Sequence, residues 1–224
     1  MATLLLRLAA PMQSWGIDSK FDTRKTNREP TKSGVIGLLA AALGLRRDAD
    51  QALERLNQLR FAVRVDREGT LLVDFHTAKS EKTNYVTKRY YLADAIFLVG
   101  LESEDRPFLE QLDRALRSPA YPLFLGRRSC PPTQPICLGI RETGLKEALL
   151  EQELLVPKWR SRRAGKCRIV EDALPKERGV VPRKDLAVSF NPMQRQFAYR
   201  AVREFSAEVS TALEETTHDP FLEL

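Results

Sequence analysis

The sequence contains few of the residues that build catalytic centres or hold metal ions. Its 224 residues include two histidines, His76 and His218, and three cysteines. An odd and sparse set of cysteines provides no disulfide framework and favours a reducing compartment. Cys130 and Cys137 lie close together in the sequence, but no further Cys/His pair completes a zinc site. We therefore predict neither a bound metal nor a cofactor.

Long hydrophobic runs are also missing. Residues 2–10 form an apolar stretch that is short, is interrupted by Arg7 and lacks the charged start of a signal peptide. This stretch cannot span a bilayer, and we interpret it as a buried strand. A composition of 43% hydrophobic and 29% charged residues is typical of a soluble globular protein. We expect a cytoplasmic protein that does not contact a membrane.

Positive charge is concentrated in most of the chain, because acidic residues gather at its C-terminal end. Six of the 30 acids lie within residues 204–224, a stretch without Lys or Arg, which leaves 36 bases against 24 acids, a balance of +12, in residues 1–203. So basic a body attracts a polyanion through its long-range field and through counterion release. Nucleic acid is therefore one candidate partner, and a well-solvated basic surface is the alternative interpretation.

The order of the predicted elements indicates an α+β fold. Apolar periodicity and the stop signals Pro11 and Gly44 predict the following elements: a strand at 3–9, helices at about 33–43 and 49–59, a hairpin of 61–65 with 71–75, a strand at 93–101 and a helix from Pro107 to Leu116. This order is close to the ferredoxin-like pattern, whose sheet is a common RNA platform. We expect an RRM-like domain over residues 1–117. The looser region at 118–224 contains a basic loop, a helix at about 143–153, a late strand and the acidic tail.

An excursion at residues 76–91 departs from any core pattern. It interleaves cations with aromatic rings: Lys79, Lys82, Tyr85, Lys88, Arg89, Tyr90 and Tyr91. Cations suit phosphates and rings stack on unpaired bases, so these residues are candidate RNA contacts. The alternative is an ordinary long loop whose tyrosines fold back on the sheet.

Three further basic segments are candidate phosphate sites. Lys32 and Ser33 begin the first helix, where free N–H groups suit an anion, although simple capping is the alternative. Arg127 and Arg128 follow Gly126 and could hold a phosphate, or form a salt-bridged turn. The run at 157–168 has six cations and no acid, which is more often a solvated loop.

Catalysis has one candidate group. His76 lies near Tyr85, Lys88 and Tyr90 in the sequence, and a general base with a neighbouring cation can cleave RNA without a metal. No spacing in the sequence demands this chemistry. A metal-independent endoribonuclease therefore stays as the alternative to a binding module.

Three segments of the chain resemble a known family. They are residues 6–16 (LRLAAPMQSWG), residues 21–38 with their PTKSG motif at 30–34, and residues 121–130 (YPLFLGRRSC). They resemble the CasD family, the type I-E branch of the CRISPR-associated Cas-five proteins. The resemblance implies an RRM-like domain with a protruding thumb hairpin, here at about 76–91, and a smaller C-terminal part.

The resemblance also implies a function. Family members are non-catalytic subunits of the Cascade surveillance complex that hold the 5′ handle of the crRNA. They contact the large subunit and the first backbone subunit, and meet target DNA only indirectly. The residues of this chain on the family motifs are Gln13, Ser14, Trp15, Arg24, Lys32, Ser33, Arg127 and Arg128. In a related branch, type I-C, the corresponding protein cuts the precursor RNA, which keeps the nuclease alternative open.

Overall fold

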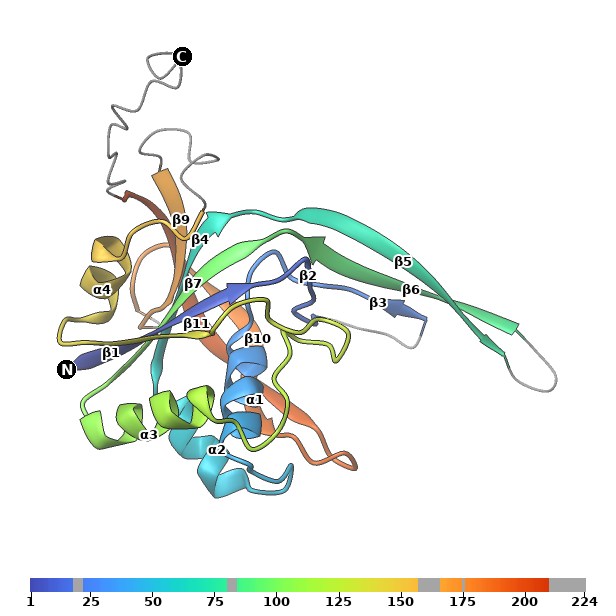
Figure 1. Cartoon of the computed structure of the whole chain (residues 1–224), viewed down its shortest axis with the longest axis horizontal. Coiled ribbons are helices and arrows are strands. Elements are labelled where there is room, and N and C mark those ends of the chain that lie inside the picture. The colour runs from blue at the N-terminus through green and yellow to red at the C-terminus, as the bar shows by residue number, and fades with distance from the viewer. Residues whose placement is uncertain (18–21, 80–83, 157–165, 175, 210–224) are drawn as a thin grey trace, which may run out of the picture.

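The structure is a computed structural model that describes residues 1–17, 22–79, 84–156, 166–174 and 176–209 (Figure 1). Of the predicted contacts, Lys82 lies outside these residues, as do most of the basic run at 157–168 and residues 210–224 of the acidic tail. None of the helices in the described ranges has the length and apolarity needed to cross a membrane.

A seven-stranded antiparallel sheet forms the centre of the fold. Its strand order is β10-β11-β9-β4-β7-β1-β8, so strands from either side of residue 117 share one sheet. The strands are β1 (Ala2–Ala9), β4 (Arg60–Arg67), β7 (Ile96–Ser103), β8 (Cys137–Arg141), β9 (Lys166–Asp172), β10 (Val180–Ser189) and β11 (Gln196–Glu208). The division of the chain at residue 117 therefore stays a prediction.

Helices cover both faces of this sheet. Leu4, Leu6 and Leu8 of β1 pack in one core with α1 (Lys32–Ala42), α2 (Asp50–Asn57) and α3 (Arg106–Arg117). Leu5 points to the other face and packs with α4 (Leu145–Glu151) in a second core. Successive side chains of a strand point to opposite faces, which is why β1 is apolar at every one of these positions.

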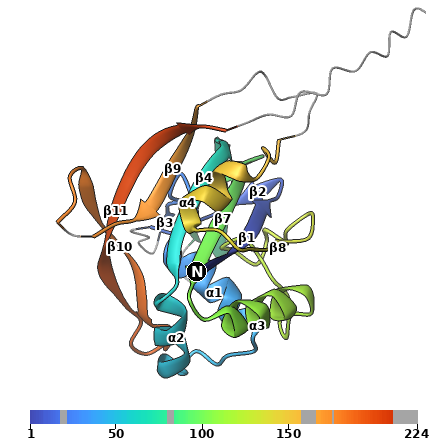
Figure 2. The ribbon, with the colours of Figure 1, turned by 90° about the vertical axis from the view of Figure 1, so that its left-hand side faces the viewer.

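A long hairpin projects from the body and belongs to a second, smaller sheet (Figure 1). Figure 2 shows the body from the opposite end, with α1, α2 and α3 in its lower half and α4 above them. The hairpin consists of β5 (Thr70–Lys79) and β6 (Asn84–Ala93), paired in one unbroken antiparallel register. At its base, β6 also pairs with the short strands β2 (Met12–Gln13) and β3 (Thr23–Arg24). The predicted excursion at 76–91 is thus the outer part of a regular two-stranded ribbon.

The predicted pairing of residues 61–65 with 71–75 is wrong. β4 pairs with β7 and β9, whereas β5 pairs with β6. The alternation of Leu71, Val73 and Phe75 suggested a half-buried strand, but Leu71 and Phe75 are 57% and 63% exposed. Alternation shows that a strand has one apolar face, and it does not show whether the same chain covers that face.

Candidate nucleic-acid interface

Gln13 and Trp15 lie in the interior where the hairpin joins the body. The Gln13 side-chain amide donates to the carbonyl oxygens of Leu8 at 3.2 Å and Ala95 at 2.8 Å. Its own oxygen accepts from Trp15 Nε1 at 3.2 Å. These bonds fasten β2 to β1 and to the start of β7. The Gln13 side chain is therefore a structural link and offers no free polar group to a ligand.

The segment 121–130 crosses directly over the first motif at Ser14. The Ser14 N–H donates to the Leu125 carbonyl at 3.1 Å, and Ser14 Oγ donates to the Tyr90 carbonyl at 3.1 Å. Gly126 has a φ of +87°, and a Cβ there would lie 1.7 Å from the Ser14 carbonyl oxygen. Only glycine fits this crossing. Residues 126–128 are thereby brought to the base of the hairpin.

Arg127 connects this segment to the hairpin. Its Nη2 donates to the carbonyl oxygen of Arg24 on β3 at 2.9 Å, and its guanidinium carbon lies 4.6 Å from the centre of the Tyr91 ring. No acid within the described residues pairs with it, so the predicted alternative of a salt-bridged turn is not what the geometry shows. Arg128 and the Arg24 side chain are exposed beside it. Solvent, and therefore a phosphate, can reach both of them.

The register of the hairpin divides its side chains between two faces. Paired residues share a face, so Asp74, His76 and Tyr85 lie on one side, while Lys88 and Tyr90 lie on the other. His76 forms a hydrogen bond with Asp74 on its own strand. The four groups of the nuclease alternative are therefore not gathered on one face.

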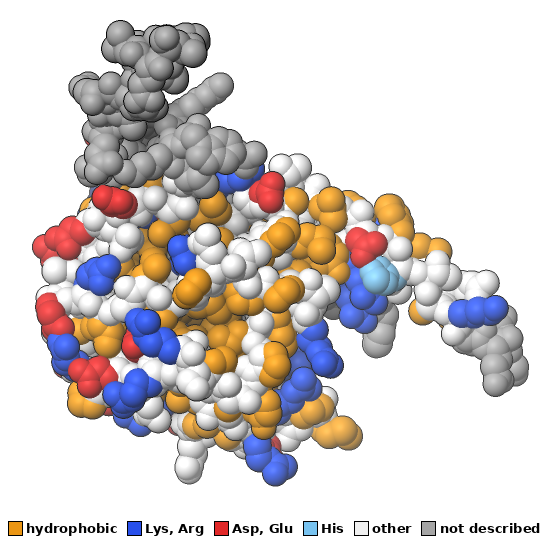
Figure 3. Space-filling model, viewed as in Figure 1, with side chains coloured by type: hydrophobic (Ala, Val, Ile, Leu, Met, Phe, Trp, Pro, Cys, Tyr) orange, Lys and Arg blue, Asp and Glu red, His pale blue; other side chains and the backbone are white. Residues whose placement is uncertain are grey.

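The second face of the hairpin is largely apolar. It presents Val73, Phe75 and Val86, all exposed, together with Lys79 and Lys88 as its cations. Figure 3 shows the hairpin from the side on which its His side chain is visible, with Lys and Arg side chains below it and down the adjacent edge of the body. The predicted contacts Lys79, Tyr85 and Lys88 are exposed, whereas Arg89 and Tyr90, nearer the base, are partly buried.

Lys32 lies in the interior rather than at a surface for phosphate. It is 4% exposed, and Nζ donates to Asp172 Oδ2 and to the Leu59 carbonyl, both at 2.8 Å. Burial lowers the pKa of this ammonium group, and the nearby Asp172 carboxylate opposes the shift. The geometry does not support a phosphate contact at Lys32.

The N-terminus of α1 already faces an anion, which is the carboxylate of Asp185. The Lys32 backbone N–H donates to Asp185 Oδ2 at 2.9 Å, and Arg200 on β11 also donates to this carboxylate. Thr31 Oγ1 caps the helix by accepting from the Gly34 N–H at 3.3 Å. The capping interpretation of this motif therefore describes the helix start, with an internal carboxylate in place of a phosphate.

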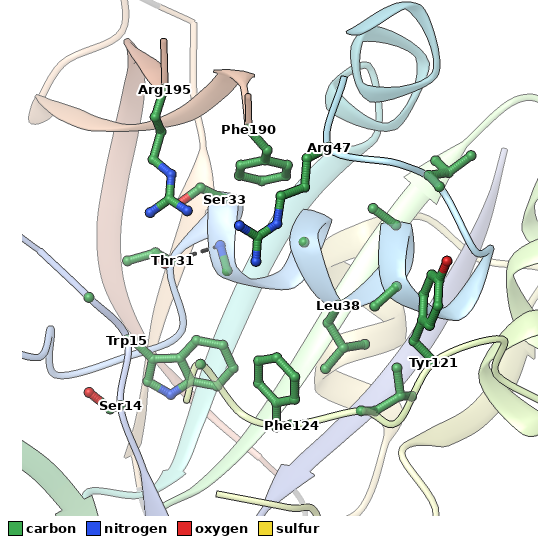
Figure 4. A pocket seen from close by; sticks show the side chains of 18 of the residues that line it. Ser14, Trp15, Thr31, Ser33, Leu38, Arg47, Tyr121, Phe124, Phe190 and Arg195 are labelled. Carbon is green, nitrogen blue, oxygen red and sulfur yellow. Dashed lines mark hydrogen bonds between the residues drawn. The ribbon is translucent and has the colours of Figure 1, made fainter. Parts of the chain in front are cut away.

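A cavity of about 650 Å³ lies against the outer side of α1 (Figure 4). It joins parts of all three motif segments to two segments that sequence reasoning missed. The motif residues among its lining are Ser14, Trp15, Gly16, Thr31, Ser33, Gly34, Gly37, Leu38, Tyr121, Pro122, Leu123, Phe124 and Gly126. Arg46 and Arg47 follow α1, Phe190 and Arg195 come from the turn between β10 and β11, and Phe197 comes from the start of β11.

Metal-ligating clusters are missing from the described residues, and their thiols are shielded from solvent. No group of three or more His, Cys, Asp and Glu side chains within them could hold a metal ion. The thiols of Cys130, Cys137 and Cys167 are free and buried. Burial raises the pKa of the Cys137 thiol to about 12, helped by its contact with the Asp113 carboxylate. A thiol with such a pKa is a weak nucleophile at neutral pH.

Comparison with known proteins assigns the chain to a family. The family described as "CRISPR-associated protein (Cas_Cas5)" matches residues 3–203, and the chain belongs to it. The chain is 39% identical over 171 residues to the CRISPR system Cascade subunit CasD of Escherichia coli (strain K12), which covers 67% of this chain and 76% of that protein. These matches confirm the resemblance to the CasD branch found in the sequence motifs.

Two solved structures are similar in fold. A chain from a structure titled "CRISPR RNA-guided surveillance complex" is 32% identical and superposes with a TM-score of 0.80, covering 95% of both chains. A chain from a structure titled "Crystal structure of Cas protein" is 44% identical with a TM-score of 0.72, covering 92% of this chain and 95% of that one. The mixed α/β architecture is thus shared along nearly the whole chain.

Proposed function

We propose that this protein is a non-catalytic subunit of a type I-E Cascade complex, in which it binds the 5′ handle of the crRNA and helps to assemble the backbone that targets DNA. One observation carries this proposal. The motif segments at 13–16, 31–34 and 121–130 meet at the base of the hairpin and around one cavity, beside the exposed cations Arg24 and Arg128. The relative named as a Cascade subunit supports the same role.

The architecture suits RNA binding. In our proposal, β1, α1, β4, β7, α3 and β8 form a ferredoxin-like, RRM-like unit whose four strands lie in the order β4-β7-β1-β8. The hairpin is inserted between β4 and β7 and serves as the thumb. The strand β8 comes from beyond residue 117, so it adds a last strand to the unit predicted at 1–117.

Different side chains at the hairpin and its base suit different parts of the complex. Phosphates of a single strand suit Arg24, Arg128 and the hairpin lysines, while unpaired bases suit the exposed ring of Tyr85. The apolar face with Phe75 and Val86 suits the protein partners, which are the large subunit and the first backbone subunit. Target DNA is met only indirectly, and the complex works in the cytoplasm.

The nuclease alternative receives little support from the geometry. Cleavage without a metal needs a base and a cation that act on one phosphate. His76 and Lys88 point to opposite faces of the hairpin, and His76 is bound to Asp74. We therefore favour binding without scission.

One experiment tests the proposal. The purified chain is incubated in EDTA with repeat RNA and, separately, with the isolated 5′ handle. We expect salt-dependent binding of the handle and intact repeat RNA on a denaturing gel. A discrete handle-sized product would establish the endoribonuclease instead. No association with the handle, by the chain alone or within the assembled complex, would refute the role altogether.

A further inference from the structure

We propose that the cavity beside α1 binds the base of one unpaired nucleotide, and that Gly37 is the residue that keeps room for it. This inference rests on the proposed function, because it takes the guide RNA as the ligand. It adds a defined subsite with two aromatic walls, one of which comes from the C-terminal third of the chain.

The walls of the cavity have the chemistry that holds a planar ring. Trp15 and Phe124 lie on one side of the space and Phe190 on the other, with α1 behind (Figure 4). Trp15 is only 1% exposed and backs this wall, so the rings that a base can reach are Phe124 and Phe190. Phe197 supports Phe190 in an edge-on contact, with 6.5 Å between ring centres. Unstacked bases bind proteins by stacking on such rings.

The rim of the cavity has the charge that suits a phosphate. Three arginines and no Asp or Glu line the space. Arg46 forms an exposed pair with Asp48 at 3.4 Å, but within the described ranges Arg47 and Arg195 form no ion pair. Their guanidinium groups point from one side into the space in front of α1 (Figure 4). An apolar pocket with a purely cationic rim favours a nucleotide over an apolar or basic protein side chain.

The glycine at position 37 is not required by the fold. A Cβ at Gly37 would lie 3.6 Å from Phe190 Cζ, which is ordinary contact, and its backbone is helical. Gly34 differs, because a Cβ there would lie 2.9 Å from Trp15 Cε3. Glycine within a helix is destabilising relative to alanine, so Gly37 weakens α1 without relieving any clash. What it allows is the close approach of the Phe190 ring to the helix, so a larger side chain at position 37 would push that ring into the cavity.

The Phe190 wall is anchored to the start of α1. Arg200 on β11 binds Asp185 on β10, and Asp185 accepts from the Lys32 N–H at 2.9 Å. Asn57 on α2 also donates to the Ala187 carbonyl at 2.5 Å. These bonds hold the β10–β11 segment against the helices, so that Phe190 faces Trp15 and Phe124 across a fixed gap. The subsite therefore forms only when both ends of the chain are folded together.

Fluorescent RNA and three variants test the subsite. The 5′ handle is synthesised with 2-aminopurine at each position in turn, and its fluorescence and affinity are measured with the full chain. We expect one position to be quenched on binding, because its base stacks in the cavity. Gly37→Leu and Phe190→Ala should abolish that quenching and weaken binding roughly 10-fold. Gly37→Ala should weaken binding less while raising the melting temperature. Tyr199→Ala, which removes an exposed ring outside the cavity, is the matched control and should change neither.

The outcomes separate the subsite from the function. If the wild-type chain binds no handle, the proposed function fails. If it binds with unchanged affinity and quenching in the Gly37 and Phe190 variants, the subsite alone is overturned. If those variants bind RNA normally but lose a protein subunit in a pull-down of the complex, the cavity takes a protein side chain, and the inference is wrong. A rise in melting temperature for Gly37→Ala excludes misfolding as the cause of weaker binding.

Discussion

The ammonium group of Lys32 and the carboxylate of Asp172 form an interior ion pair, with 2.8 Å between Nζ and Oδ2. Asp172 also accepts from Arg200 Nη1 at 2.6 Å and from the Phe61 N–H at 3.0 Å. The pair connects the first turn of α1 to β9 and, through Arg200, to β11. Lys32 belongs to the PTKSG motif, in which we predicted an RNA contact. Its side chain instead helps to hold α1, β9 and β11 together.

Replacing Lys32 by Met should therefore reduce stability and leave RNA contacts unchanged. Breaking a buried ion pair typically costs about 3–5 kcal/mol, and we expect about 3 kcal/mol because Arg200 still neutralises Asp172. Urea unfolding measures the loss. The folded variant should keep the wild-type dependence of handle affinity on salt, since no phosphate contact is removed. If the salt dependence of handle affinity decreases in this variant, Lys32 contacts a phosphate after all.

Glu29 should make the protein sensitive to acid. Its side chain is 2% exposed and pairs with Arg183 and with Arg168, the latter at 2.9 Å. Burial alone would raise its pKa, but the two guanidinium groups outweigh burial and lower the pKa below the ordinary value of 4.5. The carboxylate therefore stabilises the fold above pH 4.5, and this stabilisation is lost as the pH falls through the lower, folded value.

Glu29→Gln measures this contribution. At neutral pH the variant should be less stable by about 2 kcal/mol, because it loses charge-assisted hydrogen bonds. The difference from wild type should shrink as the pH falls from 4.5 through the lower pKa of the folded state, because the wild-type carboxylate then becomes protonated. Urea midpoints at several pH values test the sign. A difference that stays constant in acid would mean that Glu29 titrates alike in the folded and unfolded states.

Local elements of the fold were predictable, and their pairing was not. The spacing of Phe108, Leu109, Leu112 and Leu116 predicted the helix α3, and all four are buried. The partner of a strand depends on residues far away in the chain, so the alternation in β5 was compatible with two pairings. Only the structure shows that β7, and not β5, lies beside β4.

The candidate site was also only partly predictable from the sequence. The motifs identified Ser14, Ser33 and Gly126, which do line one cavity. Nothing in the sequence pointed to Phe190 or Arg195, because their segment reaches the cavity only through the long-range pairing of β10 with β11 and of β11 with β9. Motif reasoning also could not tell the buried cation of the PTKSG motif from an exposed one, since burial is a property of the assembled fold.

Exposed motif cations should carry part of the salt dependence of binding. Arg24 and Arg128 are exposed at the base of the hairpin. For single strands, each lost phosphate contact lowers the slope of log K against log salt by about 0.7, so the double variant Arg24→Glu/Arg128→Glu should lower it by about 1.4 or more. Arg114→Glu, an exposed change on α3 away from the hairpin, is the control. Equal slopes for the double variant and wild type would show that Arg24 and Arg128 do not contact RNA phosphates.

Gly126→Ala should displace the segment that carries Arg127. A Cβ there would meet the Ser14 carbonyl oxygen at 1.7 Å, in addition to the strain of a φ of +87°. Gly179→Ala is a matched control, because its φ is +74° but nothing lies within 4 Å of the added Cβ. Left-handed strain alone costs about 1–2 kcal/mol. We expect Gly179→Ala to lose about that much stability and to bind the handle normally, and Gly126→Ala to lose more and to bind weakly.

Similar stability and binding for the two alanine variants would show that the crossing at Ser14 is not needed for the interface. The Arg127 bond to the Arg24 carbonyl gives a second readout, since its loss should free the β3 segment. Hydrogen exchange at the amides of residues 22–24 should then rise in Gly126→Ala and stay at the wild-type level in Gly179→Ala.

Shortening the hairpin should separate folding from assembly. Phe75 and Lys88 are paired, so residues 76–87 can be replaced by Asn-Gly, a dipeptide that favours tight hairpin turns, while Lys88 and Arg89 keep their pairing with β3. Every described residue in that range is exposed or partly exposed, while the buried Tyr91 and Leu92 are kept. The melting temperature should therefore stay close to wild type. Handle affinity and co-purification with the other Cascade subunits should both fall, because the removed ribbon carries the exposed side chains of Lys79, Tyr85 and Val86. A shortened chain that assembles and binds the handle normally would show that the hairpin contributes to neither.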